Sequence, residues 1–87
     1  MILHTFNKPK ALVKNRHFVS PRDTILLMED GVYSLLDENL LKGMNNIFAL
    51  EIDLAARGIK VAQHEVSITY EKFVSLCVEA EQISNWF

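Results

Sequence analysis

A continuous apolar segment in the first half of the chain restricts the fold more than any other feature. Residues 24–28 read TILLM, and the polar residues 29–31 follow at once. A strand that is apolar on both faces is typical of a parallel sheet covered on both sides, whereas a half-exposed strand alternates apolar and polar residues. Further strands are predicted at 1–6, 46–50 and 65–70.

Segments with helical periodicity lie between these strands. The apolar spacing and the flanking residues predict helices over 9–18, 32–44, 53–58 and 70–82. Strands and helices therefore alternate, and consecutive parallel strands are joined by right-handed crossovers. We expect one α/β domain over residues 1–87, a small three-layer domain in which helices cover a mainly parallel, four-stranded sheet.

The size and apolar content of the chain limit how it can be stable. Its 87 residues suffice for one small domain, and 49% of them are hydrophobic. A domain of this size buries only about 60% of its unfolded surface, so an isolated monomer would be marginally stable. The chain therefore either packs a dense core or contributes apolar surface to a partner.

Charge is distributed unevenly along the chain. The net charge is −2, which argues against a dedicated nucleic-acid-binding protein. Residues 1–22 nevertheless contain five Lys or Arg residues and no acid. The basic segment 8–22 could meet phosphate or an acidic partner, or it could be the solvated side of a helix. The solvated helix needs fewer assumptions and is the preferred interpretation.

The sequence indicates a soluble, cytosolic protein. A single cysteine, Cys77, excludes an internal disulfide and fits a reducing compartment. The N-terminal segment is interrupted by His4 and followed by Lys8, so it lacks the core of a secretory signal. The apolar runs are far shorter than the ~20 residues that a membrane span needs.

Motifs for cofactor or metal binding are missing from the sequence. No glycine-rich phosphate-binding motif occurs, and the three histidines lie far apart, so we expect no cofactor and no metal. His4 lies in a predicted buried strand, where a hydrogen-bonded structural role is favoured over that of a general base. Asp30 and Asp53, at strand ends, are interpreted as turn and cap residues rather than as an acid/base pair.

The sole cysteine is the remaining candidate for chemistry. Helical spacing places Cys77 on an apolar stripe together with Tyr70, Phe73, Val74 and Ala80. It lies two turns into its helix and is followed by Glu79 and Glu81, so nothing nearby favours a thiolate. We interpret Cys77 as a small buried side chain, with a nucleophile or sulfur carrier as the alternative.

Several segments, taken in order, carry a family resemblance. The chain reads LHTF at 3–6, LLMEDGVYSLL at 26–36, FALEIDLAARGI at 48–59 and YEKFVSLCV at 70–78, and it ends in NWF. Together these segments resemble the DsrH-type (TusB) family of the DsrE/DsrF/DsrH sulfur-relay group along nearly the whole chain. The combination of DGV, ALxxDLxARG and a YxxFVxL helix, with a tryptophan near the end, is specific, whereas any one of them alone would be weak.

The resemblance implies an α/β fold and membership of a heterohexamer with two copies each of TusB-, TusC- and TusD-type subunits. That complex passes persulfide sulfur, through a TusE-like acceptor, toward a tRNA thiouridylase for 2-thiolation of the wobble uridine. The sulfur-bearing cysteine belongs to the TusD-type subunit. The resemblance therefore implies a non-catalytic subunit, and we expect no direct contact with tRNA.

One departure from the family bears on the branch to which the chain belongs. DsrH proteins of sulfur-oxidising bacteria carry a cysteine shortly after the first strand, and the corresponding segment 7–22 has none. This difference favours the tRNA-thiolation branch; the alternative is a DsrH-like sulfur-trafficking protein or a sulfurtransferase that uses Cys77 as persulfide carrier. We expect Ile83, Trp86 and Phe87 at a subunit interface, although the same residues could fold back on the chain's own sheet.

Overall fold

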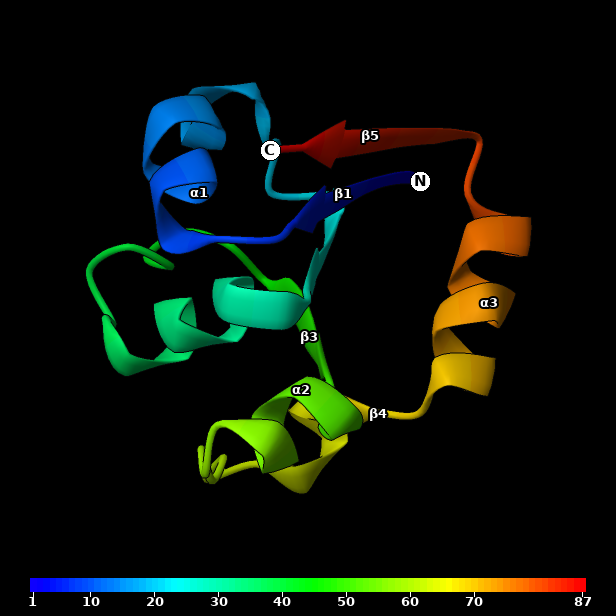
Figure 1. The fold of residues 1–87 in the computed structure, drawn as a ribbon. Coiled ribbons are helices and arrows are strands. Elements are labelled where there is room, and N and C mark those ends of the chain that lie inside the picture. Colours follow the sequence, from blue (N-terminus) through cyan, green and yellow to red (C-terminus); the bar gives the residue numbers. More distant parts are fainter.

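The computed structural model describes all residues 1–87 and contains a five-stranded sheet in which every neighbouring pair of strands is parallel (Figure 1). The strands are β1 (Ile2–Phe6), β2 (Thr24–Leu27), β3 (Asn46–Leu50), β4 (Ser67–Ile68) and β5 (Gln82–Trp86), and their order in the sheet is β4-β3-β2-β1-β5. The α/β class and the parallel sheet are confirmed. The expected number of four strands is wrong by one, because the prediction does not include β5.

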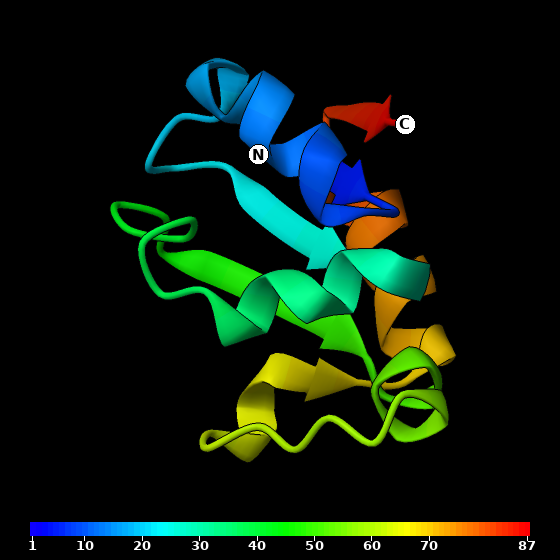
Figure 2. The ribbon, with the colours of Figure 1, turned by 60° about the vertical axis from the view of Figure 1, so that its left-hand side comes forward.

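Helices cover the two faces of the sheet unequally. The α-helices are α1 (Pro9–Asn15), α2 (Glu51–Ala56) and α3 (Tyr70–Glu79), and the 3₁₀ segments are η1 (Arg16–Phe18), η2 (Glu29–Leu36) and η3 (His64–Val66). The helix α1 and the segment η2 lie on one side of the sheet, whereas α3 alone lies on the other (Figures 1 and 2). None of these helices has the length and apolar character needed to cross a membrane.

The core consists of two clusters, one on each side of the sheet. Ile25 and Leu27 of β2 belong to the cluster beneath α1 and η2, while Leu26 belongs to the cluster beneath α3. Successive residues of a strand point to opposite faces, which explains why the three belong to different clusters. All three side chains are buried because both faces are covered at β2. The TILLM segment is thus covered on both faces, as its composition predicts.

The C-terminal residues form a strand instead of continuing the last helix. The predicted helix 70–82 ends at Glu79, because Ala80 is extended and the amide of Glu81 donates to the carbonyl of Met1 at 3.0 Å. From there β5 pairs with β1 in register from Ile2↔Gln82 to Phe6↔Trp86. Pairing with the open edge of β1 therefore replaces the last helical turn, and the prediction for this segment is wrong.

The predicted helix over 32–44 is also wrong. The structure has the 3₁₀ segment η2 up to Leu36, followed by turns. The backbone leaves the helical region at Asp37, whose carboxylate accepts the amides of Asn39 at 3.1 Å and Leu40 at 3.3 Å. An aspartate that bonds to nearby amides competes with a continuing helix and favours a turn. The predicted strand 65–70 is likewise reduced to Ser67–Ile68.

Candidate functional site

Polar side chains from two motifs meet where β2 and β3 end. The Nε of Arg57, in the DLxARG motif, donates to Asp30 Oδ1 of the DGV motif at 2.9 Å. One guanidinium nitrogen of Arg57 also donates to the carbonyl of Asp53 at 3.2 Å. Asp53 Oδ2 accepts the amide of Glu29 at 2.8 Å, and Glu29 has φ of 48°, a left-handed conformation that is unfavourable for a residue with a side chain.

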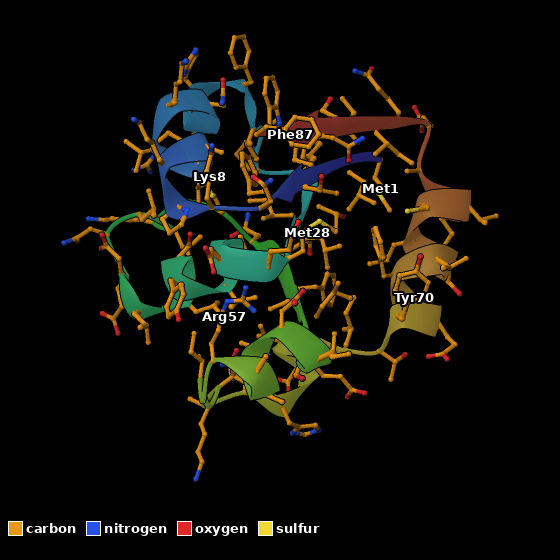
Figure 3. All side chains as sticks on the ribbon, in the orientation of Figure 1. Met1, Lys8, Met28, Arg57, Tyr70 and Phe87 are labelled. Carbon is orange, nitrogen blue, oxygen red and sulfur yellow. The ribbon has the colours of Figure 1, made fainter.

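Arg57 thus lies between η2 and α2 and holds the two strand ends together (Figure 3). Its hydrogen bond with Asp30 raises the pKa of Arg57 above its already high value, so the guanidinium stays charged. Asp30 therefore accepts from Arg57, and Asp53 accepts from the backbone of the strained turn at Glu29. The interpretation of the two as turn and cap residues holds only in part, because neither is an N-cap: Asp30 lies within η2, and Asp53 lies in the first turn of α2, whose N-cap is Leu50.

The surroundings of Gly31 explain why the DGV motif contains a glycine. A Cβ atom at this position would lie 2.1 Å from the carbonyl oxygen of Phe6, far inside van der Waals contact. The segment η2 therefore packs directly against the backbone at the end of β1. The DGV and DLxARG motifs, two of those that carry the family resemblance, are accounted for by packing and by hydrogen bonds within the chain.

A second polar cluster lies inside the molecule and contains His4. The Nε2 atom of His4 lies 2.8 Å from Asp23 Oδ2, and Trp86 Nε1 donates to His4 Nδ1 at 3.0 Å. An indole nitrogen can only donate, so Nδ1 of His4 accepts and the proton of the neutral ring is on Nε2, where it is donated to Asp23. His4 and Asp23 are 3% and 7% exposed, which leaves no open side for a substrate.

Asp23 is the orienting carboxylate that could not be identified from sequence. Burial by itself raises the pKa of Asp23, but the hydrogen bonds from the amide of Ser20 and from His4 outweigh burial and lower the pKa below its usual value. The cluster therefore joins the turn before β2, strand β1 and strand β5. Its geometry supports the structural role expected for His4.

The three predicted interface residues lie on different surfaces. Trp86 is half-buried and stacks on Phe18 at a centroid distance of 5.3 Å and on Phe6 at 6.5 Å. Ile83, three residues earlier in β5, lies on the opposite face of the strand and is 42% exposed. Phe87 follows the strand and is 78% exposed. Trp86 thus packs on the chain's own core, while Ile83 and Phe87 keep free surface.

The environment of Cys77 differs in part from the prediction. Leu76 is the buried side chain of α3, and Phe73, Cys77 and Ala80 are partly buried beside it. Tyr70 and Val74, which the helical stripe predicts as buried, are 63% and 45% exposed. The prediction is wrong for these two because the sheet contacts α3 on the side of Leu76. Burial raises the pKa of the Cys77 thiol, which disfavours the thiolate.

The one hollow on the surface lies away from these clusters. It has a volume of about 350 Å³ and is lined mainly by apolar side chains from η2 and from the segment that follows α2, namely Leu35, Leu36, Ile59, Lys60, Val61, Ala62, Gln63 and Val66. No group of three histidine, cysteine, aspartate or glutamate side chains is arranged to hold a metal ion. The hollow contains a single charged residue, Lys60, and no acid/base pair.

The fold and these contacts define a small α/β protein whose characteristic motifs build the carboxyl edge of a parallel sheet. Residues 8–83 match the family described as DsrH like protein, and the chain belongs to this family. It is 32% identical to Protein TusB of Escherichia coli O81 over 98% of this chain and 100% of the relative. It is also 35% identical to Protein TusB of Erwinia tasmaniensis and to that of Yersinia pestis, in each case over 74% of this chain and 75% of the relative.

Proposed function

We propose that this chain is a TusB-type, non-catalytic subunit of a sulfur-relay complex that supports 2-thiolation of the wobble uridine of tRNA. The observation that carries the proposal is the similarity to proteins named TusB along 98% of the chain. The chemistry of the chain is consistent with it: the only thiol is partly buried with a raised pKa, and the buried His4–Asp23 pair has no open side.

The proposed complex contains TusC-like and TusD-like subunits, with two copies of each of the three chains, and the TusD-like subunit carries the sulfur on its cysteine. A TusE-like acceptor and a tRNA thiouridylase follow in the relay, in the cytoplasm. This chain supplies surface for assembly and makes no direct contact with tRNA. Phe87 and Ile83 support such a role, because both side chains are apolar and exposed. Trp86 also belongs to the proposed interface, because part of its side chain remains accessible.

Co-expression tests the proposed assembly. When the chain is produced together with the TusC-like and TusD-like proteins of its own genome, we expect the three to co-purify through a tag on one of them. Size-exclusion chromatography with light scattering should then give the mass of a heterohexamer. A control expression omits the TusD-like protein. Purification of this chain as an isolated monomer, while the other two assemble without it, would contradict the proposal.

The alternative function, a sulfurtransferase with Cys77 as persulfide carrier, is tested by Cys77→Ala. We expect the 2-thiouridine content of tRNA, measured by mass spectrometry of digested tRNA in cells that lack the native gene, to remain within about two-fold of wild type. A Cys→Ala variant of the sulfur-bearing cysteine in the TusD-like protein is the positive control and should abolish the modification. Loss of 2-thiouridine in Cys77→Ala cells with the complex still assembled would favour the alternative.

A further inference from the structure

The apolar arc of α3 is wider than the part that the sheet covers. Leu76 faces the sheet, and Phe73, Cys77 and Ala80 border it. Three more apolar side chains follow at intervals of four residues and project away from the sheet, so they form one strip along the helix, which we call the α3 ridge. They are Tyr70, Val74 and Val78, exposed by 63%, 45% and 80%.

The ridge is not an isolated exposed side chain of the kind found on every protein surface. Its members lie on consecutive turns and continue directly from the buried side of the helix through Cys77, so that apolar atoms cover more than half of the helix circumference. No other helix lies on this side of the sheet to cover them (Figures 1 and 2). The other face, by contrast, is covered by α1 and η2 together.

The charges beside the ridge indicate what kind of surface can cover it. The row Glu71, Ser75 and Glu79 runs parallel to the ridge, one residue further along at each position. All three are exposed, and neither glutamate forms an ion pair within the chain. A partner that covers the ridge therefore meets carboxylates at its border, and a border of lysine or arginine side chains is complementary to them.

We propose that the α3 ridge is the docking surface for a partner subunit whose contacting strip is apolar and bordered by lysine or arginine. The partner rests on the proposed function, because it is a subunit of the relay complex. The location rests on the ridge alone. Cys77 lies between the ridge and the sheet, partly exposed, so docking covers it as well.

The double substitution Val74→Glu with Val78→Glu tests the location. We expect the isolated variant chain to bind the remaining subunits of the complex with at least ten-fold lower affinity than the wild-type chain. Titration of each chain against the co-purified remaining subunits measures the affinity. The matched control is Val13→Glu, an exposed valine on α1, which lies on the opposite side of the sheet and is 59% exposed. It should bind within about two-fold of wild type. Circular dichroism confirms that each variant is folded.

Two further measurements keep the test decisive if the double variant unfolds. Glu71→Lys with Glu79→Lys changes only exposed polar residues, and it should weaken binding several-fold at low salt and less at high salt. The alkylation rate of Cys77 in the unmodified chain, followed by mass spectrometry of its peptide, should fall at least five-fold in the complex.

The outcomes separate this proposal from the function on which it rests. Wild-type chain that fails to assemble overturns both. Assembly that survives the Val74→Glu/Val78→Glu change, or unchanged alkylation of Cys77 in the complex, overturns the docking surface and leaves the function in place. Loss of binding with Val13→Glu instead moves the interface to α1. If the isolated chain dimerises through the ridge, the occupant is a second copy and the partner proposed here is wrong.

Discussion

Gly31→Ala is expected to leave the chain largely unfolded. The new Cβ would lie 2.1 Å from the carbonyl oxygen of Phe6 and 2.9 Å from its carbonyl carbon. That carbonyl cannot turn away freely, because it accepts the amide of Met28 at 3.1 Å, and the Phe6 side chain is fully buried. Overpacking costs about 1–3 kcal/mol in a tolerant core and more against rigid backbone. A chain of this length has a total stability of only about 4–13 kcal/mol.

Thermal and urea unfolding followed by circular dichroism measure the effect. Gly43→Ala is the control, since Gly43 has φ of 86° and no atom lies within 4 Å of the added Cβ. This control should lose only the ~1–2 kcal/mol that a left-handed conformation costs a residue with a side chain. If Gly31→Ala and Gly43→Ala lost equal free energies of unfolding, the close contact between η2 and β1 would not require glycine at residue 31.

Asp23→Ala is expected to destabilise the fold by about 1.5–4.5 kcal/mol at neutral pH. It leaves the buried Nε2 of His4, 2.8 Å from Asp23, without an acceptor at ~1–3 kcal/mol, and it removes the part-buried hydrogen bond from the amide of Ser20 at 2.9 Å, worth ~0.5–1.5 kcal/mol. Urea unfolding at pH 7 measures the loss. The exposed Asp30→Ala provides a control with the same chemical change at the surface. A loss no larger than that of the control would contradict the role assigned to Asp23.

The lowered pKa of Asp23 also predicts how stability depends on pH. Burial raises the pKa of Asp23, but the hydrogen bonds that Ser20 and His4 donate to the carboxylate outweigh burial and hold the pKa below its usual value in the folded chain. A lowered carboxyl pKa contributes stability above the unfolded value, and this contribution is lost as the pH falls through the folded value. The stability difference between wild type and Asp23→Asn should therefore be largest at neutral pH and shrink below about pH 4. A difference that stays constant from pH 7 to pH 3 would contradict this linkage.

The parts of the fold that local sequence predicts well are those with a strong local signal. Leu26 and its neighbours form an apolar strand without polar alternation, and such a strand is stable only inside a covered parallel sheet. Thr69, just before the last helix, bonds through its hydroxyl to the amide of Lys72 at 3.1 Å and so caps the helix, which fits the predicted start at residue 70. In both cases the signal lies within a few residues of the chain, although the strands that pair with Leu26, β1 and β3, come from elsewhere in the sequence.

The fifth strand has no comparable local signal. Residues 82–86 read QISNW, which neither alternates nor forms an apolar run, and the helical pattern before them continues into Gln82. The segment becomes a strand because the edge of β1 offers unpaired backbone groups and because Trp86 reaches His4. The family resemblance includes a tryptophan close to the end of the chain, and Trp86 lies in β5. A tryptophan at this place does not by itself predict a strand.

The candidate site divides in the same way. That Asp30 and Asp53 lie near strand ends follows from sequence, and the structure adds that Arg57, at the end of α2, joins both carboxylates. The partner of His4 could not be found, because Asp23 is 19 residues away in an unremarkable turn and Trp86 is 82 residues away. The predicted apolar stripe of α3 is too narrow and misplaced, because it omits Leu76, the buried residue of the helix, and Val78; only the position of the sheet selects Leu76 over Val74.

The sequence by itself determined that this chain forms an α/β fold with a parallel sheet buried on both sides, because the apolar runs and the helical spacing that specify it are local properties of the chain. The tertiary structure decided three things: the edge at which the C-terminal residues pair, the neutral His4 held between Asp23 and Trp86, and the half of the α3 apolar arc that stays exposed. Each depends on contacts between segments far apart in the chain, whose free energy is gained only after the sheet has brought them together.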